Sequence, residues 1–180
     1  MNTATSDKGI TAQLRKRSAS DGHTSGSLWP FLLGAWNLRS YVEVPESGAA
    51  ERYPLGPDAK GTLIYSPDGY MSVQIMRCGR SPFASGDWFS PTDAELRDAA
   101  AFIAYSGPFS VNEKARTVTH TVEVSFFPNW LRRMEVRNAK MGESELILVP
   151  HRAIRSGGND VKPQLRWSRV SPGTPTAEGQ

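Results

Sequence analysis

Alternating apolar and polar residues predict a β-hairpin in the stretch 56–76 of this 180-residue chain. Thr62 to Tyr65 is a short run of β-branched and aromatic residues, which suits a pleated, half-buried strand. Ser66 to Gly69 reads Ser-Pro-Asp-Gly, a sequence that favours a tight turn. The strand after this turn has one apolar and one more polar face, formed by Met71, Val73 and Ile75 and by Ser72, Gln74 and Met76.

The same alternation recurs along the chain and predicts six further strands, at residues 33–44, 105–111, 116–125, 132–139, 145–151 and 164–170. With the hairpin they make eight, the number that closes into a barrel able to enclose one small ligand. We therefore expect an all-β fold, an eight-stranded antiparallel up-and-down β-barrel. The residues expected to point inward from two of its strands are Trp36, Leu38, Ser40 and Val42, and Val118, His120, Val122 and Val124.

One short helix is predicted between the hairpin and the next strand. Ser90 is a suitable N-cap, and Pro91 stands at the favoured first position of the helix. One apolar stripe follows at helical spacing, formed by Leu96, Ala99, Ala100 and Ile103. This helix is expected to lie against the barrel wall or over the barrel mouth.

The two ends of the chain are predicted to be tails around a barrel domain at residues 28–170. Residues 1–27 are rich in Ser, Thr, Gly and charge, and have few large apolar side chains to offset the entropy of ordering. Within this flexible N-terminal tail, Ile10 to Lys16 has the spacing of one or two helical turns, and we consider it as a lid over the barrel mouth. Residues 171–180 are expected to be a disordered C-terminal tail.

Composition narrows the class of protein. The net charge is +3 and the isoelectric point is near 9.2, but the positive residues are scattered, and no recognition helix or aromatic RNA platform accompanies them. Cys78 is the single cysteine, which favours a reducing compartment. The sequence shows neither a long apolar span nor the apolar core of a signal peptide. We therefore expect a cytoplasmic protein, monomer or homodimer, without a nucleic-acid or membrane partner.

Several of these segments together resemble a known family. Gly34-Ala35-Trp36, the segment from Tyr53 to Ala59, the hairpin from Gly61 to Met76 and a later Ser-Phe-Phe-Pro-Asn-Trp segment closely resemble the bacterial and fungal lipocalin-like domain family, over about residues 32–170. The resemblance implies that Trp36 plugs the closed end of a barrel. It also implies that an arginine of the last strand, Arg166 or Arg169, packs across that tryptophan.

His120 is the first candidate for chemistry, because regular alternation places it among inward-facing valines. A neutral imidazole there is a candidate general base or a hydrogen-bond partner of a ligand. If the strand has the opposite register, Thr119, Thr121 and Glu123 face the cavity instead. Relatives in the family often read His-His-Val-Glu where this chain reads His120-Thr121-Val122-Glu123, so this chain lacks the second histidine of that pattern.

The predicted site therefore has two candidate catalytic residues and seven candidate ligand-binding residues. The catalytic candidates are His120 and Glu123, and the ligand-binding candidates are Gln74, Ser72, Tyr65, Tyr105, Phe109, Trp130 and Met76. Gln74 and Ser72 are neutral polar groups that would orient a ligand, and the aromatic residues would form a stacking wall or ordinary core. Arg77, at the end of the hairpin, is expected to be solvated.

The sequence lacks the P-loop, the dinucleotide-binding glycine pattern, the zinc-protease motif, paired cysteines and the serine nucleophile elbow. No cofactor or metal is therefore expected. Two functions remain. The first is a cofactor-independent cyclase or isomerase that acts on a largely apolar metabolite of polyketide or terpenoid biosynthesis, as the family resemblance implies. The alternative is a non-catalytic small-molecule carrier or binding protein.

Overall fold

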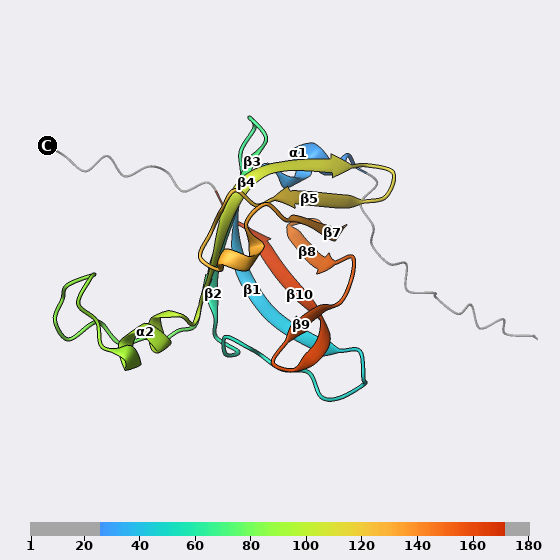
Figure 1. Ribbon diagram of the computed structural model, residues 1–180. Coiled ribbons are helices and arrows are strands. Elements are labelled where there is room, and N and C mark those ends of the chain that lie inside the picture. Colours follow the sequence, from blue (N-terminus) through green and yellow to red (C-terminus); the bar gives the residue numbers. More distant parts are fainter. Residues whose placement is uncertain (1–25, 172–180) are drawn as a thin grey trace, which may run out of the picture.

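The computed structural model describes residues 26–171, which form a closed antiparallel β-barrel (Figure 1). Neighbouring barrel strands pair in chain order, and the first strand also pairs with the last, which closes the sheet. The eight barrel strands are β1 (Gly34–Pro45), β2 (Lys60–Tyr65), β3 (Tyr70–Met76), β4 (Phe102–Asn112), β5 (Thr117–Thr121), β7 (Met134–Met141), β8 (Glu145–Pro150) and β10 (Asn159–Arg169). The predicted all-β, eight-stranded barrel is confirmed.

Five shorter elements accompany the barrel. They are α1 (Leu28–Leu32), α2 (Asp93–Ala99), the 3₁₀ turn η1 (Pro128–Trp130), β6 (Val124–Ser125) and β9 (Ile154–Ser156). β6 pairs with β4, and β9 pairs with β10. No helix among the described residues has the length and apolar character needed to cross a bilayer.

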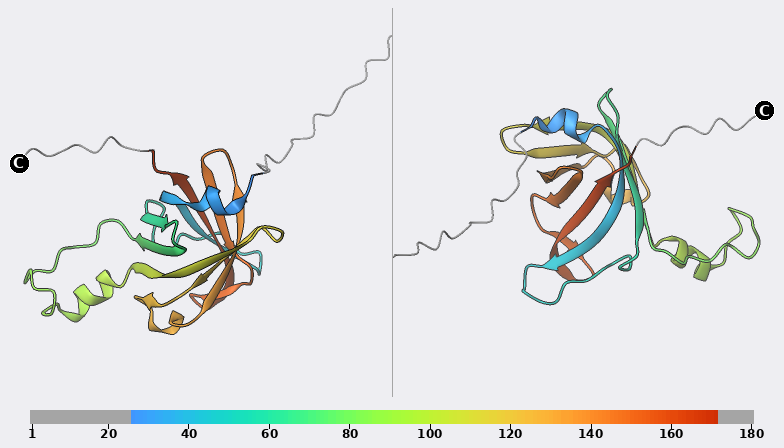
Figure 2. Two further views of the ribbon diagram at one scale, coloured as in Figure 1. Left: turned by 90° about the horizontal axis from the view of Figure 1, so that it is seen from above. Right: turned by 180° about the vertical axis from the view of Figure 1, so that it is seen from behind.

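One end of the barrel is closed by α1 and by Trp36 of β1. Figures 1 and 2 show α1 lying across this end. Trp36 is fully buried, and its Nε1 donates a hydrogen bond of 2.8 Å to the Leu32 carbonyl oxygen. The guanidinium carbon of Arg169 lies 4.1 Å from the Trp36 ring centroid, and Arg169 also donates to the Leu33 carbonyl oxygen. Arg169 is therefore the arginine that packs across the plug tryptophan.

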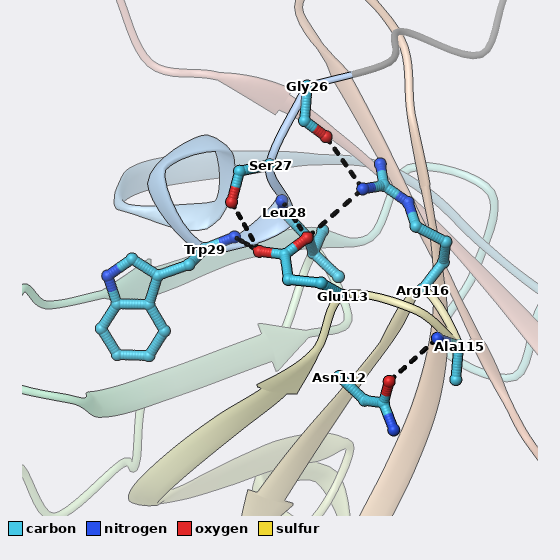
Figure 3. A network of polar contacts seen from close by, with 8 residues as sticks. All are labelled: Gly26, Ser27, Leu28, Trp29, Asn112, Glu113, Ala115 and Arg116. Carbon is cyan, nitrogen blue, oxygen red and sulfur yellow. Dashed lines mark hydrogen bonds and ion pairs between the residues drawn. The ribbon is translucent and has the colours of Figure 1, made fainter.

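The start of α1 is held by a carboxylate from the β4–β5 turn. Glu113 accepts hydrogen bonds from the Ser27 hydroxyl at 2.6 Å and from the backbone N–H groups of Leu28 and Trp29 at 2.7 and 3.0 Å (Figure 3). These contacts satisfy backbone donors that a helix start leaves without partners. Arg116 in turn forms an ion pair of 3.5 Å with Glu113. Glu113, which is 85 positions from Leu28 in the chain, thus holds α1 at the closed end of the barrel.

A β-bulge in β1 changes which side chains face the interior. The pairing of β1 with β10 shifts between Leu38 and Ser40, so Arg39 is an extra residue in the strand. Beyond the bulge, Tyr41 and Glu43 are buried, and they line the interior. The prediction that Ser40 and Val42 share the inward face of Trp36 is therefore wrong, because one inserted residue exchanges the two faces of a strand.

A second shift occurs where β4 passes from β5 to β6. Phe109 pairs with His120, whereas Ser106 pairs with Val124, so the pairing changes by one residue between them. Gly107 lies at this point, and a Cβ built there would come within 2.0 Å of the Thr121 carbonyl oxygen. Val118, His120 and Val122 are buried as predicted, but Val124 is exposed, and its predicted inward position is wrong.

The helix α2 belongs to an arm that projects from the barrel between β3 and β4 (Figures 1 and 2). Its N-cap is Thr92, which forms a capping box with Glu95, rather than the predicted Ser90. Leu96 is 52% exposed, Trp88 is 78% exposed and Phe89 is 89% exposed. The helix has no buried residue, so the prediction that it lies against the barrel wall or over the mouth is wrong.

Candidate functional site

The barrel encloses a cavity of about 330 Å³, which lies in the size range of small-molecule pockets. Side chains from most barrel strands line it, and apolar and aromatic groups predominate. The apolar lining includes Leu63, Val73, Ile75, Ile103, Leu148, Leu165 and Trp167, with Leu55, Phe126, Phe127, Trp130 and Ile154 from segments outside the eight barrel strands. The polar lining consists of Tyr41, Glu43, Tyr105, His120, Arg137, Arg155 and Ser156.

His120 is held between two tyrosine hydroxyls. Its position on β5, opposite Phe109 of β4, turns the ring inward, and the residue is 1% exposed. Nε2 lies 2.7 Å from the Tyr65 hydroxyl oxygen, and Nδ1 lies 3.1 Å from the Tyr105 hydroxyl oxygen. Burial, and secondarily the positive charge of Arg137, lower the pKa of His120 from 6.5 to about 3. The imidazole is therefore neutral at physiological pH.

Arg137 brings a positive charge to the cavity wall beside this imidazole. It lies on the inward face of β7 and pairs with Glu135 at 3.6 Å. Its guanidinium also interacts with the Tyr105 hydroxyl. Burial by itself lowers the pKa of Arg137, but the contacts with Tyr105 and Glu135 outweigh this effect and hold the pKa above its usual value. Burial raises the pKa of both Tyr65 and Tyr105, so both phenols keep their protons.

A second polar cluster contains Glu43. The Tyr41 hydroxyl donates to Glu43 Oε1 at 3.1 Å, and Arg52 Nε donates to Glu43 Oε2 at 2.8 Å. Glu43 is 1% exposed, so the Arg52 partner offsets much of the cost of burying its charge. Burial, and then the Glu43 charge, raise the pKa of Tyr41.

Five of the predicted site residues lie in or next to the interior site. His120, Tyr105 and Trp130 line the cavity. Tyr65 and Phe109 are buried on the side of the closed end, where the Tyr65 and Phe109 rings meet edge to face at 4.8 Å between centroids. Trp29 stacks on Phe109 at 4.7 Å. Whether these five residues contact a ligand stays a prediction.

The other four predicted site residues do not face the interior. Ser72, Gln74 and Met76 lie on the outer face of β3, because Met71, Val73 and Ile75 occupy its inner face. Gln74 and Met76 border a groove on the outside of the barrel instead. Glu123 is exposed, so the alternative register that would place it in the cavity is not adopted. Arg77, expected to be solvated, forms an exposed ion pair with Asp98. The proposed lid, Ile10 to Lys16, lies outside the described residues.

Sequence reasoning missed Tyr41, Glu43, Arg137 and Trp167. Tyr41 and Glu43 were missed because the bulge at Arg39 places them on the inward face. Arg137 was missed because the hydrophobic pattern that identified the strands predicts apolar residues on that face. Trp167 is buried in the cavity wall, and its Nε1 has no hydrogen-bond partner among the described residues. An unsatisfied buried donor of this kind calls for an explanation, and a ligand oxygen would provide one. Within residues 26–171, no three His, Cys, Asp or Glu side chains gather as a metal ion would need.

Comparison with known proteins gives two findings. A family model described as a lipocalin-like domain matches residues 33–170. A curated protein of Aspergillus oryzae, named 4'-hydroxy-3'-methoxypropiophenone carrier protein, is 32% identical over 107 residues, which cover 56% of this chain and 96% of that protein. The resemblance noted from the sequence motifs thus coincides with the matched region.

Proposed function

The chain belongs to the lipocalin-like domain family, and we propose that its barrel binds and carries a small, largely apolar aromatic metabolite in the interior cavity. Both the family and the relative's name support the binding of a small molecule. The identity of the ligand and the carrier role are our proposal. It draws on the relative, which is named for carrying an aryl ketone.

The observation that carries this proposal is the chemistry of the cavity wall. Apolar side chains surround a few polar groups, and the buried side-chain atoms among these groups, except Trp167 Nε1, already have a protein partner. Such a wall binds an apolar body by burial and orients it through one or two hydrogen bonds. The unsatisfied Trp167 donor supports a ligand that brings an oxygen acceptor to this wall.

The state of His120 favours carriage over acid/base chemistry. A general base works best when its pKa is near the working pH. The pKa of His120 is about 3, so its neutral ring is a weak base. Both ring nitrogens are also engaged by tyrosine hydroxyls, Nε2 by Tyr65 and Nδ1 by Tyr105.

A cofactor-independent cyclase or isomerase of polyketide or terpenoid biosynthesis is the second candidate. The observation that favours it is the concentration of an imidazole, a phenol and a guanidinium on one inner wall, through His120, Tyr105 and Arg137. Groups of this kind stabilise an enol or enolate when a carbonyl compound reacts. His120→Gln separates the two functions: a cyclase that uses the ring loses roughly 10²–10⁴ in rate, whereas a carrier has no turnover to lose.

The binding test uses two phenols, 4'-hydroxy-3'-methoxypropiophenone and 2-methoxy-4-propylphenol, with titration calorimetry on the purified chain. We expect one molecule of ligand per barrel. Leu148→Phe, which fills part of the cavity, should weaken binding at least about tenfold. Ile64→Phe adds an aromatic ring on the outer face, where Ile64 is 44% exposed, and should leave affinity unchanged.

Three outcomes of this test have clear meanings. If neither phenol binds, the proposed function is wrong for aromatic ligands. If Leu148→Phe and Ile64→Phe bind as the unchanged chain does, the ligand does not occupy the interior. Recovery of the bound compound after incubation, analysed by mass spectrometry, distinguishes carriage from conversion, because a changed product would favour the cyclase or isomerase.

A further inference from the structure

The hydrogen bonds around His120 have a direction that follows from counting donors and acceptors. A neutral imidazole has one N–H donor and one nitrogen acceptor. Its two nitrogens face two hydroxyls, Tyr65 at Nε2 and Tyr105 at Nδ1. One hydroxyl must therefore donate to the ring while the other accepts from it. The two arrangements leave different hydroxyl protons without an acceptor.

Tyr65 lies in a place where its proton has one destination. The side chain is 1% exposed, it does not line the cavity, and it packs against Phe109. Among residues 26–171, His120 Nε2 is the polar group within hydrogen-bond distance of the Tyr65 hydroxyl. If Tyr65 accepted from the ring, its own buried proton would have no acceptor, at a cost of about 1–3 kcal/mol. Tyr65 therefore donates to Nε2.

The direction at Tyr65 fixes the direction at Tyr105. With Nε2 as the acceptor, the ring proton is on Nδ1 and is donated to the Tyr105 oxygen. The Arg137 guanidinium interacts with the same hydroxyl, and it can act as a donor alone. The Tyr105 oxygen thus accepts from His120 and Arg137, which leaves the proton of Tyr105 to be donated. Tyr105 lines the cavity, so that proton has a ligand within reach.

We propose that the Tyr105 hydroxyl, polarised by His120 and Arg137, donates a hydrogen bond to a carbonyl oxygen of the ligand, which makes carbonyl-bearing aromatic compounds the ligand class of this barrel. This inference rests on the proposed function, since it names the group that orients the carried molecule. Two donors on the Tyr105 oxygen strengthen the bond that its own proton makes. His120 acts here as a positioning residue, because its part is to set the direction of the Tyr105 hydroxyl.

The two tyrosines provide a matched pair of variants. Tyr105→Phe and Tyr65→Phe each remove one hydroxyl that contacts His120, but Tyr105 lines the cavity and Tyr65 does not. The probes are 4'-hydroxy-3'-methoxypropiophenone and 2-methoxy-4-propylphenol, which differ in the carbonyl group. The unchanged chain should bind the ketone about 10–100 times more tightly, since the compound without the oxygen leaves the buried hydroxyl without an acceptor.

Tyr105→Phe should abolish most of this preference by weakening ketone binding alone. Tyr65→Phe should keep a larger part of it, because this variant retains the Tyr105 hydroxyl and the Arg137 donor beside it. Equal affinity of the unchanged chain for the two probes, or loss of the preference in Tyr65→Phe with retention in Tyr105→Phe, would overturn the inference. In these cases at least one probe binds, so the proposed function survives. Failure of both probes to bind the unchanged chain would remove both.

The protonation of the imidazole gives a second, independent measurement on the unchanged chain. Nitrogen NMR of labelled histidine distinguishes the two neutral tautomers, and we expect the His120 proton on Nδ1. A proton on Nε2 would contradict the inference even if Tyr105→Phe fails to fold. With the proton on Nε2, Tyr105 would donate to the ring and have no proton left for a carbonyl oxygen.

Discussion

Trp36→Ala is expected to lower the free energy of unfolding by about 3–5 kcal/mol. The side chain is fully buried at the closed end of the barrel. A tryptophan buries roughly 200 Å² of surface, which at about 25 cal/mol per Å² corresponds to some 5 kcal/mol, of which alanine retains part. The substitution also removes the hydrogen bond from Nε1 to the Leu32 carbonyl oxygen and the stacking of Arg169 on the ring.

Urea unfolding followed by far-ultraviolet circular dichroism measures this loss without relying on tryptophan fluorescence. The slope of the free energy with urea should stay the same, because the surface exposed on unfolding changes little. The melting temperature should fall by about 6–20 °C. Trp36→Phe separates the contributions: it keeps a ring for Arg169 and removes the Nε1 donor, so a loss of about 1–3 kcal/mol is expected.

Trp88→Ala is the matched control for this measurement. Trp88 is 78% exposed on the projecting arm, and its removal should change stability by no more than about 0.5 kcal/mol. A Trp36→Ala loss below about 1 kcal/mol, or a loss equal to that of Trp88→Ala, would refute the view that Trp36 and α1 close a packed end of the barrel.

Three further predictions concern pH and the arm. The hydrogen bonds of Ser27 and of the α1 backbone lower the pKa of Glu113 from 4.5, so the stabilisation by Glu113 is present above pH 4.5 and is lost as pH falls through the lowered value. Glu113→Ala should cost about 1 kcal/mol at pH 7 and Glu123→Ala much less, and this difference should shrink in unfolding curves measured at successively lower pH below 4.5. The pKa of His120 falls from 6.5 to about 3 on folding, so between these values the unfolded chain binds a proton that the folded chain does not. The free energy of unfolding should therefore decrease below pH 6.5, by up to about 1.4 kcal/mol per pH unit. A His120→Gln chain whose free energy of unfolding changes equally with pH between 6.5 and 4 would contradict this. Leu96→Ala in α2 should lower the free energy of unfolding in urea by less than about 0.5 kcal/mol, because Leu96 is exposed. Leu63→Ala, at a buried position, should lower it by about 2–5 kcal/mol. Similar losses in the two variants would mean that the arm packs on the barrel.

The strand pattern was readable because each barrel strand has one buried face. The alternation through Val118, His120 and Val122 placed the histidine inward correctly, and the turn from Ser66 to Gly69 lies between β2 and β3 as expected. These features depend on local sequence, where the period of two and the turn residues act directly. The packing of an arginine on Trp36 came from the family resemblance, and the structure selects Arg169.

The parts that could not be read depend on partners distant in the chain. Arg39 looks like any outward residue of an alternating strand, and its role as the bulge residue is set by the pairing of β1 with β10. Gly107 lies inside the predicted strand 105–111, but its close approach to Thr121, where the pairing of β4 shifts and Val124 is turned outward, depends on a contact between two strands. Arg137 is charged yet faces inward, because Glu135 and Tyr105 compensate it. The start of α2 was readable in principle, since Thr92 and Glu95 have the spacing of a capping box.

The bulge at Arg39 has a consequence for how ligand preference in such barrels can evolve. Deletion of the single codon for Arg39 would restore uninterrupted pairing of β1 with β10, and the period of two would then run unbroken from Trp36 through Leu38. Tyr41 and Glu43 would keep their inward positions, because the bulge holds the one residue that interrupts this alternation. The length of β1 can therefore change by one residue at this point without changing which of its side chains line the cavity. New ligand preference in this strand must come from substitution of the lining residues themselves.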